Sequence, residues 1–242
     1  MGNALVNPLD RKKKETWHGV LFGVLLSILI VFCLCFITFN IVFMRFQIVG
    51  VSMQPTFNAS LPYGTLQSYN DSKIKDIAYV NKFSKGKRGD IVVLNSTTLG
   101  ENIIKRIIAV GGDKIDIALD PETSEYYVYL GIGGGDMVKQ EEPYILNRGD
   151  MSLTYPGDND TKSFAQLKAD RPDLVQYDEN FNDYVIVVPQ GYVFVMGDNR
   201  AHSDDSTDPQ IGPFNLSSIV GTVAFTIPYN VSFLAYWWNR IF

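Results

Sequence analysis

The hydrophobic positions of this chain change their pattern near residue 44. From Gly19 to Met44 there are 26 positions without a charged side chain, which as a helix would be about 39 Å long, whereas the hydrocarbon core of a bilayer is ~30 Å thick. A cleavable signal peptide has a shorter apolar stretch, about 7 to 15 residues, followed by small residues at the cut. Ordinary globular helices are also shorter. The pattern therefore predicts a retained transmembrane helix over residues 19–44.

After residue 45 the apolar residues come in short runs, rich in branched and aromatic side chains and separated by clusters of Gly, Pro, Asn and Asp. Such runs and clusters are typical of strands and turns. A short helix, ended near Pro172, is favoured only over residues 163–174. The predicted strands are 91–94, 103–110, 126–130, 185–188, 192–196 and 219–227. The expected fold class is mostly β.

The part of the chain after Met44, roughly 200 residues, is long enough for one domain with a sizeable core. Within residues 45–242 we place the core at about 45–115 and 184–230. The stretch 116–183 is more polar and richer in turns, and we interpret it as an insertion, or cap, on the β core.

Charge orients the predicted helix in the membrane. Residues 11–14 are all basic and precede it, while Arg45 alone follows closely, and the side richer in Lys and Arg usually stays in the cytoplasm. We therefore expect a cytoplasmic tail over 1–18, a single membrane span and an extracytoplasmic domain over 45–242. The whole chain carries −5 and its first 18 residues about +2, so the outer part is acidic, which argues against nucleic acid as a partner.

Lys105 is the first candidate catalytic residue. On the predicted strand 103–110 it shares a face with Ile103, Ile107 and Ala109, because side chains alternate along a strand. Burial disfavours the charged form and lowers a lysine pKa, so that a neutral amine can take a proton from a hydroxyl group. The alternative is a lysine whose stem packs while its ammonium group reaches water or an ion pair.

Two polar segments could form a catalytic site together with Lys105. Ser52 lies in the run Gly50–Thr56, only eight residues after Met44, a distance of at most about 29 Å even when extended. It is either a nucleophile close to the bilayer or a serine that bonds to turn backbone. The loop Gly197–Ser206 follows the predicted strand 192–196 and could orient a base or merely cap strands.

Four segments resemble, in order and spacing, the sequence boxes of bacterial type I signal peptidases, also called leader peptidases. These are membrane-bound Ser/Lys endopeptidases that remove signal peptides from exported proteins. About 40 residues carry the resemblance. Gly50 stands where Gram-negative members have a hydroxyl residue, and at this position the chain resembles the Gram-positive, single-anchor members. The segments are Ser52–Thr56, Arg88–Val93, Lys105–Asp113 and Gly197–Ser206.

The resemblance implies a β-rich catalytic domain of the signal-peptidase and LexA-like fold, without metal or cofactor. By the same resemblance Ser52 is the nucleophile, Lys105 is the general base and Ser203 helps to hold the lysine amine. Asp198 and Arg106 look like a structural ion pair behind the site. The remaining supporting residues in the last box are Gly197, Asn199 and Asp205.

The implied substrates are signal peptides of exported preproteins with small residues, typically Ala-x-Ala, before the cut. The implied partners are these peptides and membrane lipid, with the secretion translocon acting alongside. Walls of the small-residue pockets would include Val51, Met53 and Ile103. Other functions stay open: a catalytically silent membrane-tethered domain that binds exported peptides, or a Ser/Lys peptidase dedicated to one partner.

Several residues leave alternatives open. Thr207 stands where the family usually has an arginine, so Asp205 would be hydrated, bonded to Thr207 or paired elsewhere. His202 permits a Ser-His-Asp arrangement with Asp204 or Asp205. The acidic groups around 198–208 and 158–160 could bind calcium, although neither fits an EF-hand loop. The aromatic end, 231–242, suits either a membrane interface or core packing.

Overall fold

The computed structural model describes residues 8–59, 75–145, 164–229 and 231–241. The chain divides into two compact units, Met1–Phe43 and Met44–Phe242. We describe each unit separately.

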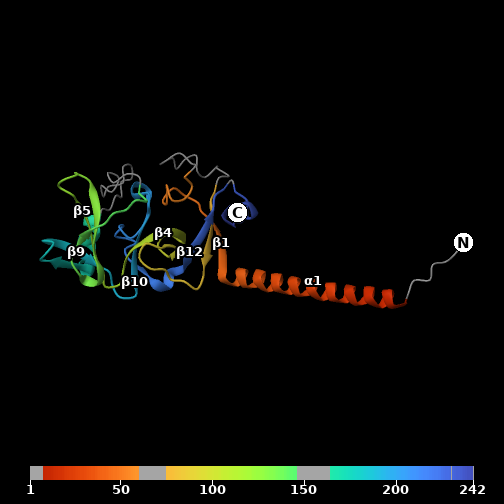
Figure 1. The fold of residues 1–242 in the computed structure, drawn as a ribbon. Helices are drawn as coiled ribbons and strands as arrows, with labels where there is room; N and C mark the ends of the chain where they lie inside the picture. The colour runs from red at the N-terminus through yellow and green to blue at the C-terminus, as the bar shows by residue number, and fades with distance from the viewer. Residues whose placement is uncertain (1–7, 60–74, 146–163, 230, 242) are drawn as a thin grey trace. The chain divides into compact units, whose positions relative to one another are not determined.

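The first unit contains helix α1, Pro8–Val42 (Figure 1). Its segment Trp17–Val42 has 26 residues; the most apolar 18-residue window in it has a mean hydropathy of 3.2, and none of that window is buried. Among the described residues it is the one helix that is long and apolar enough to cross a membrane. The predicted N-terminal apolar helix is confirmed. It ends two residues before Met44, because the chain continues at once into strand β1, Phe43–Gln47.

The second unit is built on two sheets. The first has seven strands in the order β1-β2-β12-β3-β4-β10-β11, and its pairs from β2 to β11 are antiparallel. Runs of branched residues with alternating burial form its central strands. Beyond β1 the strands are β2 Ile77–Asn81, β3 Ile91–Ser96, β4 Glu101–Val110, β10 Tyr192–Met196, β11 Phe214–Asn215 and β12 Ile219–Ile227.

The second sheet has five antiparallel strands in the order β7-β6-β5-β9-β8, drawn in green to cyan in Figure 1. The short helix α2, Phe164–Asp170, follows the prediction for 163–174, and a 3₁₀ turn over Pro172–Leu174 continues it. The segment 116–183 that we interpreted as an insertion contributes most of this sheet. The strands are β5 Lys114–Leu119, β6 Tyr126–Gly131, β7 Val138–Lys139, β8 Val175–Asp178 and β9 Asp183–Val187.

One hydrophobic cluster is shared by the two sheets. Phe194 from the first sheet, Ile115 and Ile186 from the second, and Phe164 and Leu167 from α2 are all buried in it. Burial of apolar side chains stabilises a fold by roughly 25 cal/mol per Å² of apolar area, so this cluster holds the two sheets together. The described residues of the segment between the two halves of the first sheet are therefore packed on that sheet through this shared cluster.

Strand β4 carries a bulge that changes which residues share a face. Phe194 pairs with Ala109 but the next residue, Val195, pairs with Ile107, so Ile108 is the extra residue. Ala109 packs with Ile108 in the shared cluster, while Ile107 belongs to a different cluster. The prediction that Ala109 shares the face of Lys105 is wrong, because strict alternation fails at a bulge.

The aromatic end of the chain forms helix α3, Phe233–Ile241. Part of it packs on the first sheet, where the ring centroids of Phe225 and Trp237 are 5.5 Å apart. Leu234 and Trp238 remain 80% and 64% exposed. The segment thus combines both alternatives, a packed face and an exposed apolar face, and contact of the latter with a membrane stays a prediction.

Candidate active site

The turn that carries Ser52 is held by the loop after β10. Asn199 donates twice to this turn, from its backbone N–H to the carbonyl of Ser52 at 3.0 Å and from Nδ2 to the carbonyl of Val51 at 3.0 Å. Asn199 is fully buried, so these bonds are shielded from competing water. Residues separated by almost 150 positions are thereby fixed next to each other.

Gly197 allows these two segments to approach closely. A Cβ on this residue would lie 2.4 Å from the carbonyl oxygen of Ser52 and 2.3 Å from Oγ of Ser203. Real Cβ contacts essentially never fall below 3.0 Å. Only glycine therefore fits between the Ser52 turn and Ser203 without moving one of them.

Lys105 is almost completely buried on β4, with 3% of its surface exposed. It lies opposite Val92 of β3 and between Ile103 and Ile107 on its own strand. Burial lowers the pKa of its ammonium group below the ordinary 10.5, and nearby carboxylates, Asp205 first, partly oppose this. Of the two alternatives, the structure shows a buried lysine with a lowered pKa, and not one whose ammonium group extends into solvent.

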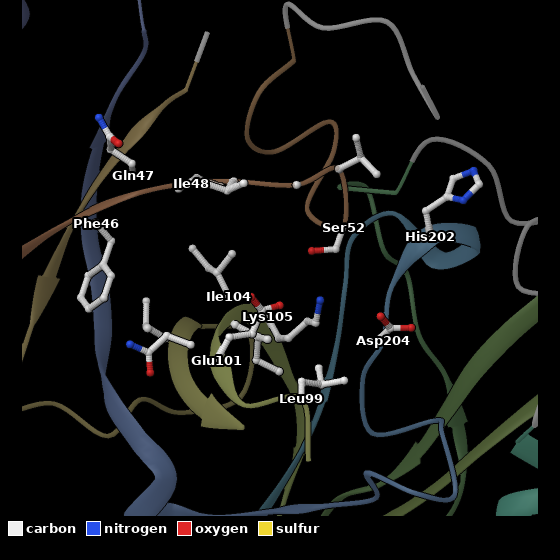
Figure 2. A pocket seen from close by; sticks show the side chains of 16 residues that line it. Phe46, Gln47, Ile48, Ser52, Leu99, Glu101, Ile104, Lys105, His202 and Asp204 are labelled. Atoms are coloured by element: carbon white, nitrogen blue, oxygen red, sulfur yellow. The ribbon is translucent and has the colours of Figure 1, made fainter. Parts of the chain in front are cut away.

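Ser52 and Lys105 line the same groove, which encloses about 620 Å³. Figure 2 shows the amine end of Lys105 directed toward the Ser52 side chain, with Asp204 and His202 on one side and Phe46 and Ile48 on the other. The groove is lined by apolar and polar side chains in similar measure, and a groove with convergent polar groups is typical of a ligand site. The arrangement can place a peptide carbonyl against a hydroxyl nucleophile with an amine base beside it.

Two of the three expected pocket residues border this groove. Val51 and Ile103 are among its lining residues. Met53 is not; it is 1% exposed and packs in a core cluster with Ile48 and Phe57. Met53 therefore packs in the core next to the Ser52 turn, and its part in a substrate pocket stays a prediction.

Asp198 and Arg106 form the ion pair that the resemblance implied. Arg106 Nε donates to Asp198 Oδ1 at 2.8 Å and Nη2 donates to Oδ2 at 2.7 Å. Thr56 also donates its hydroxyl to Asp198, and Arg106 Nη1 donates to the carbonyl of Gly89 at 2.9 Å. A bidentate pair of this kind fixes the orientation of both side chains. It therefore connects β4 to the loop after β10 through Asp198, and to the segment of Ser52 through Thr56.

Asp205 organises the end of the loop. Its Oδ2 accepts from Ser203 Oγ at 2.6 Å and from the Gly197 N–H at 2.9 Å. Its Oδ1 accepts from both the N–H and the hydroxyl of Thr207, the latter at 2.8 Å. Of the alternatives for Asp205, bonding to Thr207 is the one observed. The Ser203 hydroxyl is directed to Asp205, and its oxygen retains capacity to accept from an amine.

Sequence reasoning missed two residues at the back of the site. Glu142 forms a buried ion pair with Arg200, and Tyr144 lies over Arg106, with the ring centroid 3.9 Å from its Cζ. Both come from the segment that was interpreted as a polar insertion. A glutamate next to a proline and a tyrosine has no pattern that distinguishes it from a surface turn, so no signal in the chain pointed to them.

The acidic side chains around the loop have protein partners. Asp198 and Asp205 are held as described above, and no group of three or more His, Cys, Asp or Glu side chains suited to a metal ion occurs within the described residues. The other acidic group, 158–160, lies outside the described residues.

Comparison with known proteins gave concordant matches. A family model described as signal peptidase, peptidase S26, matches residues 21–228. Signal peptidase I P of Bacillus subtilis subsp. natto is 30% identical over 199 residues, 82% of this chain and 84% of that protein. Signal peptidase IB of Staphylococcus aureus (strain N315) is 30% identical over 202 residues, 83% and 86% of the two chains. A solved signal peptidase I structure from Enterococcus faecalis V583 covers 57% of this chain and 97% of that one, at 24% identity and a TM-score of 0.34.

Proposed function

Because the chain belongs to the signal peptidase family, peptidase S26, whose model matches residues 21–228, we propose that it removes signal peptides from exported preproteins with a Ser52–Lys105 dyad. The family resemblance of the four sequence segments is thereby confirmed, and the chain is a serine endopeptidase by family. The dyad, the cleavage preference and the membrane topology are the parts that we propose.

One observation carries the proposal for the dyad. Lys105 is buried and lines the same groove as Ser52, and its pKa is lowered by that burial. A serine hydroxyl is a weak nucleophile and needs an adjacent base. A lysine is useful as that base only when desolvation keeps a substantial fraction neutral.

The reaction follows from this geometry. As Ser52 Oγ bonds to the scissile carbonyl carbon, its proton passes to Lys105 Nζ. The resulting ammonium group protonates the leaving amine while the C–N bond breaks, which leaves an acyl ester on Ser52. Water then attacks the ester and gives a proton to Lys105, and Ser52 regains its hydroxyl proton as the peptide acid departs. The Ser52 backbone N–H is the proposed donor to the oxyanion.

The groove suits an extended peptide with small side chains next to the cut. Val51 and Ile103 border it close to Ser52 and Lys105, and we assign them to the shallow pockets that accept alanine in Ala-x-Ala. Phe46 and Ile48 extend the apolar lining. Specificity then comes from the exclusion of larger side chains, which overpack a shallow pocket.

Helix α1 is the proposed membrane anchor, with the tail 1–18 in the cytoplasm and residues 45–242 outside. The length and hydropathy of Trp17–Val42 support a span, and the basic residues 11–14 support the orientation. In this placement Ser52 lies a few residues beyond the bilayer, close to where a signal peptide would leave the membrane beside the translocon.

The test is cleavage of a preprotein with an Ala-x-Ala site by the purified full chain in detergent. Ser52→Ala and Lys105→Met are run beside it, together with a preprotein in which both alanines are replaced by leucine. We expect cleavage at the site by the parent chain only, and none of the leucine substrate. Turnover by Lys105→Met would refute the dyad. No cleavage by a folded parent chain would favour a dedicated-substrate peptidase or a silent binding domain.

A further inference from the structure

A short stretch of the second unit, residues 142–144, reaches the back of the active site, and we call it the strap. Glu142 and Arg200 form its main contact, with Arg200 Nη2 2.6 Å from Glu142 Oε1 and Nη1 3.3 Å from Oε2. Each side chain is only 2% exposed. An ion pair that is removed from water so completely is costly to desolvate, and pairs of this kind are often no more stabilising than apolar residues of the same volume.

The Arg200 guanidinium also holds the backbone of the loop Gly197–Ser206, which we call the catalytic loop. Its Nε donates to the carbonyl of Gly197 at 3.0 Å. Gly197 is the residue without a side chain that lies against the Ser52 carbonyl and Ser203, and its N–H donates to Asp205. Glu142 therefore fixes Arg200, and Arg200 fixes the Gly197 peptide, which lies between the Ser52 turn and Ser203.

Tyr144 supplies a second arm to the same place. Its hydroxyl donates to Glu142 Oε1 at 2.8 Å, and its ring lies 3.9 Å from the Cζ of Arg106. Arg106 in turn holds Asp198, the neighbour of Gly197. A cation stacked on a ring has fewer orientations available. The two arms of the strap thus meet on consecutive residues of the catalytic loop.

We propose that Glu142 and Tyr144 are positioning residues, which set the placement of Ser52 relative to Lys105 through Arg200–Gly197 and Arg106–Asp198. The inference rests on the proposed dyad and extends it to residues that do not line the groove. Its physical basis is that reacting groups must be held to a few tenths of an ångström, since a misplacement of about 1 Å can cost on the order of 100-fold in rate. Two buried, directional contacts can supply that restraint where loop backbone alone would not.

The test compares Glu142→Gln and Tyr144→Phe with a matched control, Asp116→Asn. Asp116 of β5 is equally buried and is paired with Lys168 of α2 at 2.6 Å, but it has no contact with the catalytic loop among the interactions described. Glu142→Gln keeps the shape and removes the charge. Tyr144→Phe removes only the hydroxyl and keeps the ring over Arg106, so it is expected to fold even if Glu142→Gln does not.

With preprotein substrate we expect kcat to fall about tenfold or more in Glu142→Gln and a few-fold in Tyr144→Phe, with KM changed less than about threefold. Asp116→Asn should retain kcat at a similar loss of melting temperature. Equal kcat at equal loss of melting temperature in all three variants, or a change confined to KM, would overturn the positioning role.

A second measurement does not need activity. Amide hydrogen exchange should accelerate over 50–58 and 196–207 in the strap variants and not in Asp116→Asn. Unchanged exchange in those segments would refute the inference even if the enzyme is active. Faster exchange together with a parent chain that cleaves no preprotein would instead remove the proposed function and leave the structural coupling in place.

Discussion

Gly197→Ala adds a single methyl group at the point where the nucleophile turn meets the catalytic loop. The new Cβ would lie 2.4 Å from the Ser52 carbonyl oxygen and 2.3 Å from Ser203 Oγ, against a practical minimum of 3.0 Å. Rotation of the Ser203 hydroxyl does not relieve the conflict, because Cβ of Ser203 would itself lie 2.6 Å from the new atom. The Ser52 carbonyl is backbone, so both Ser203 and the turn must move, the turn by ~0.6 Å.

The magnitude follows from that displacement. If about 1 Å of misplacement costs on the order of 100-fold in rate, ~0.6 Å costs roughly ten- to thirtyfold. Overpacking of a tight core position costs about 1 to 3 kcal/mol of stability, which for a protein of this size lowers the melting temperature by about 2 to 12 °C. We therefore expect a large loss of kcat with a moderate loss of stability.

The control is Gly131→Ala, in which the added Cβ would lie 2.4 Å from the backbone oxygen of Gly135 in the second sheet. The contact with a backbone oxygen is equally short, but it lies at the end of β6 and outside the groove. The assay is steady-state cleavage of the preprotein beside thermal unfolding of both variants in the same detergent. The reasoning fails if Gly197→Ala keeps parental kcat, or if Gly131→Ala loses as much.

Three further outcomes are expected. Lys105→Met should abolish turnover and raise the melting temperature at neutral pH. The folded-state pKa of Lys105 lies below its unfolded value, so the unfolded chain binds more protons and parental stability rises with pH between the two pKa values. The variant should lack that rise, and pH-dependent unfolding of both chains checks this. The kcat/KM of the parent should rise through an alkaline limb as Lys105 loses its proton, whereas a profile already flat by pH 6 would count against a lysine base. Asp198→Asn should cost about 3 to 5 kcal/mol in chemical denaturation, because it leaves Arg106 without its buried partner; a loss below about 1 kcal/mol would contradict that role.

The β-rich fold was predictable wherever a strand is both buried and made of branched residues. The predicted runs 192–196 and 219–227 agree with β10 and β12 at both ends. Strands β2 and β5 were missed because charged or small residues interrupt them, as Asp116 does within β5. Asp116 is tolerated there because Lys168 of α2 pairs with it, a contact that no local pattern reveals.

Much of the candidate site was also within reach of the sequence, by resemblance and by chemistry. Ser52, Lys105 and Asp198 were singled out, and the structure brings them together around one groove and the ion pair behind it. What could not be predicted is which neighbours hold them. The choice of Thr207 as partner of Asp205 depends on loop geometry, and the direction of Met53 depends on the space beneath the turn.

By itself, the sequence determined the long apolar N-terminal helix, the β-rich class and the residue types available for hydrolysis, because periodicity and side-chain chemistry are local properties. Only the tertiary structure decided the bulge that turns Ala109 to the shared cluster, the close approach at Gly197 and the burial of Glu142 against Arg200. Each of these depends on contacts between segments far apart in the chain, whose energy exists only after the two sheets pack together and exclude water.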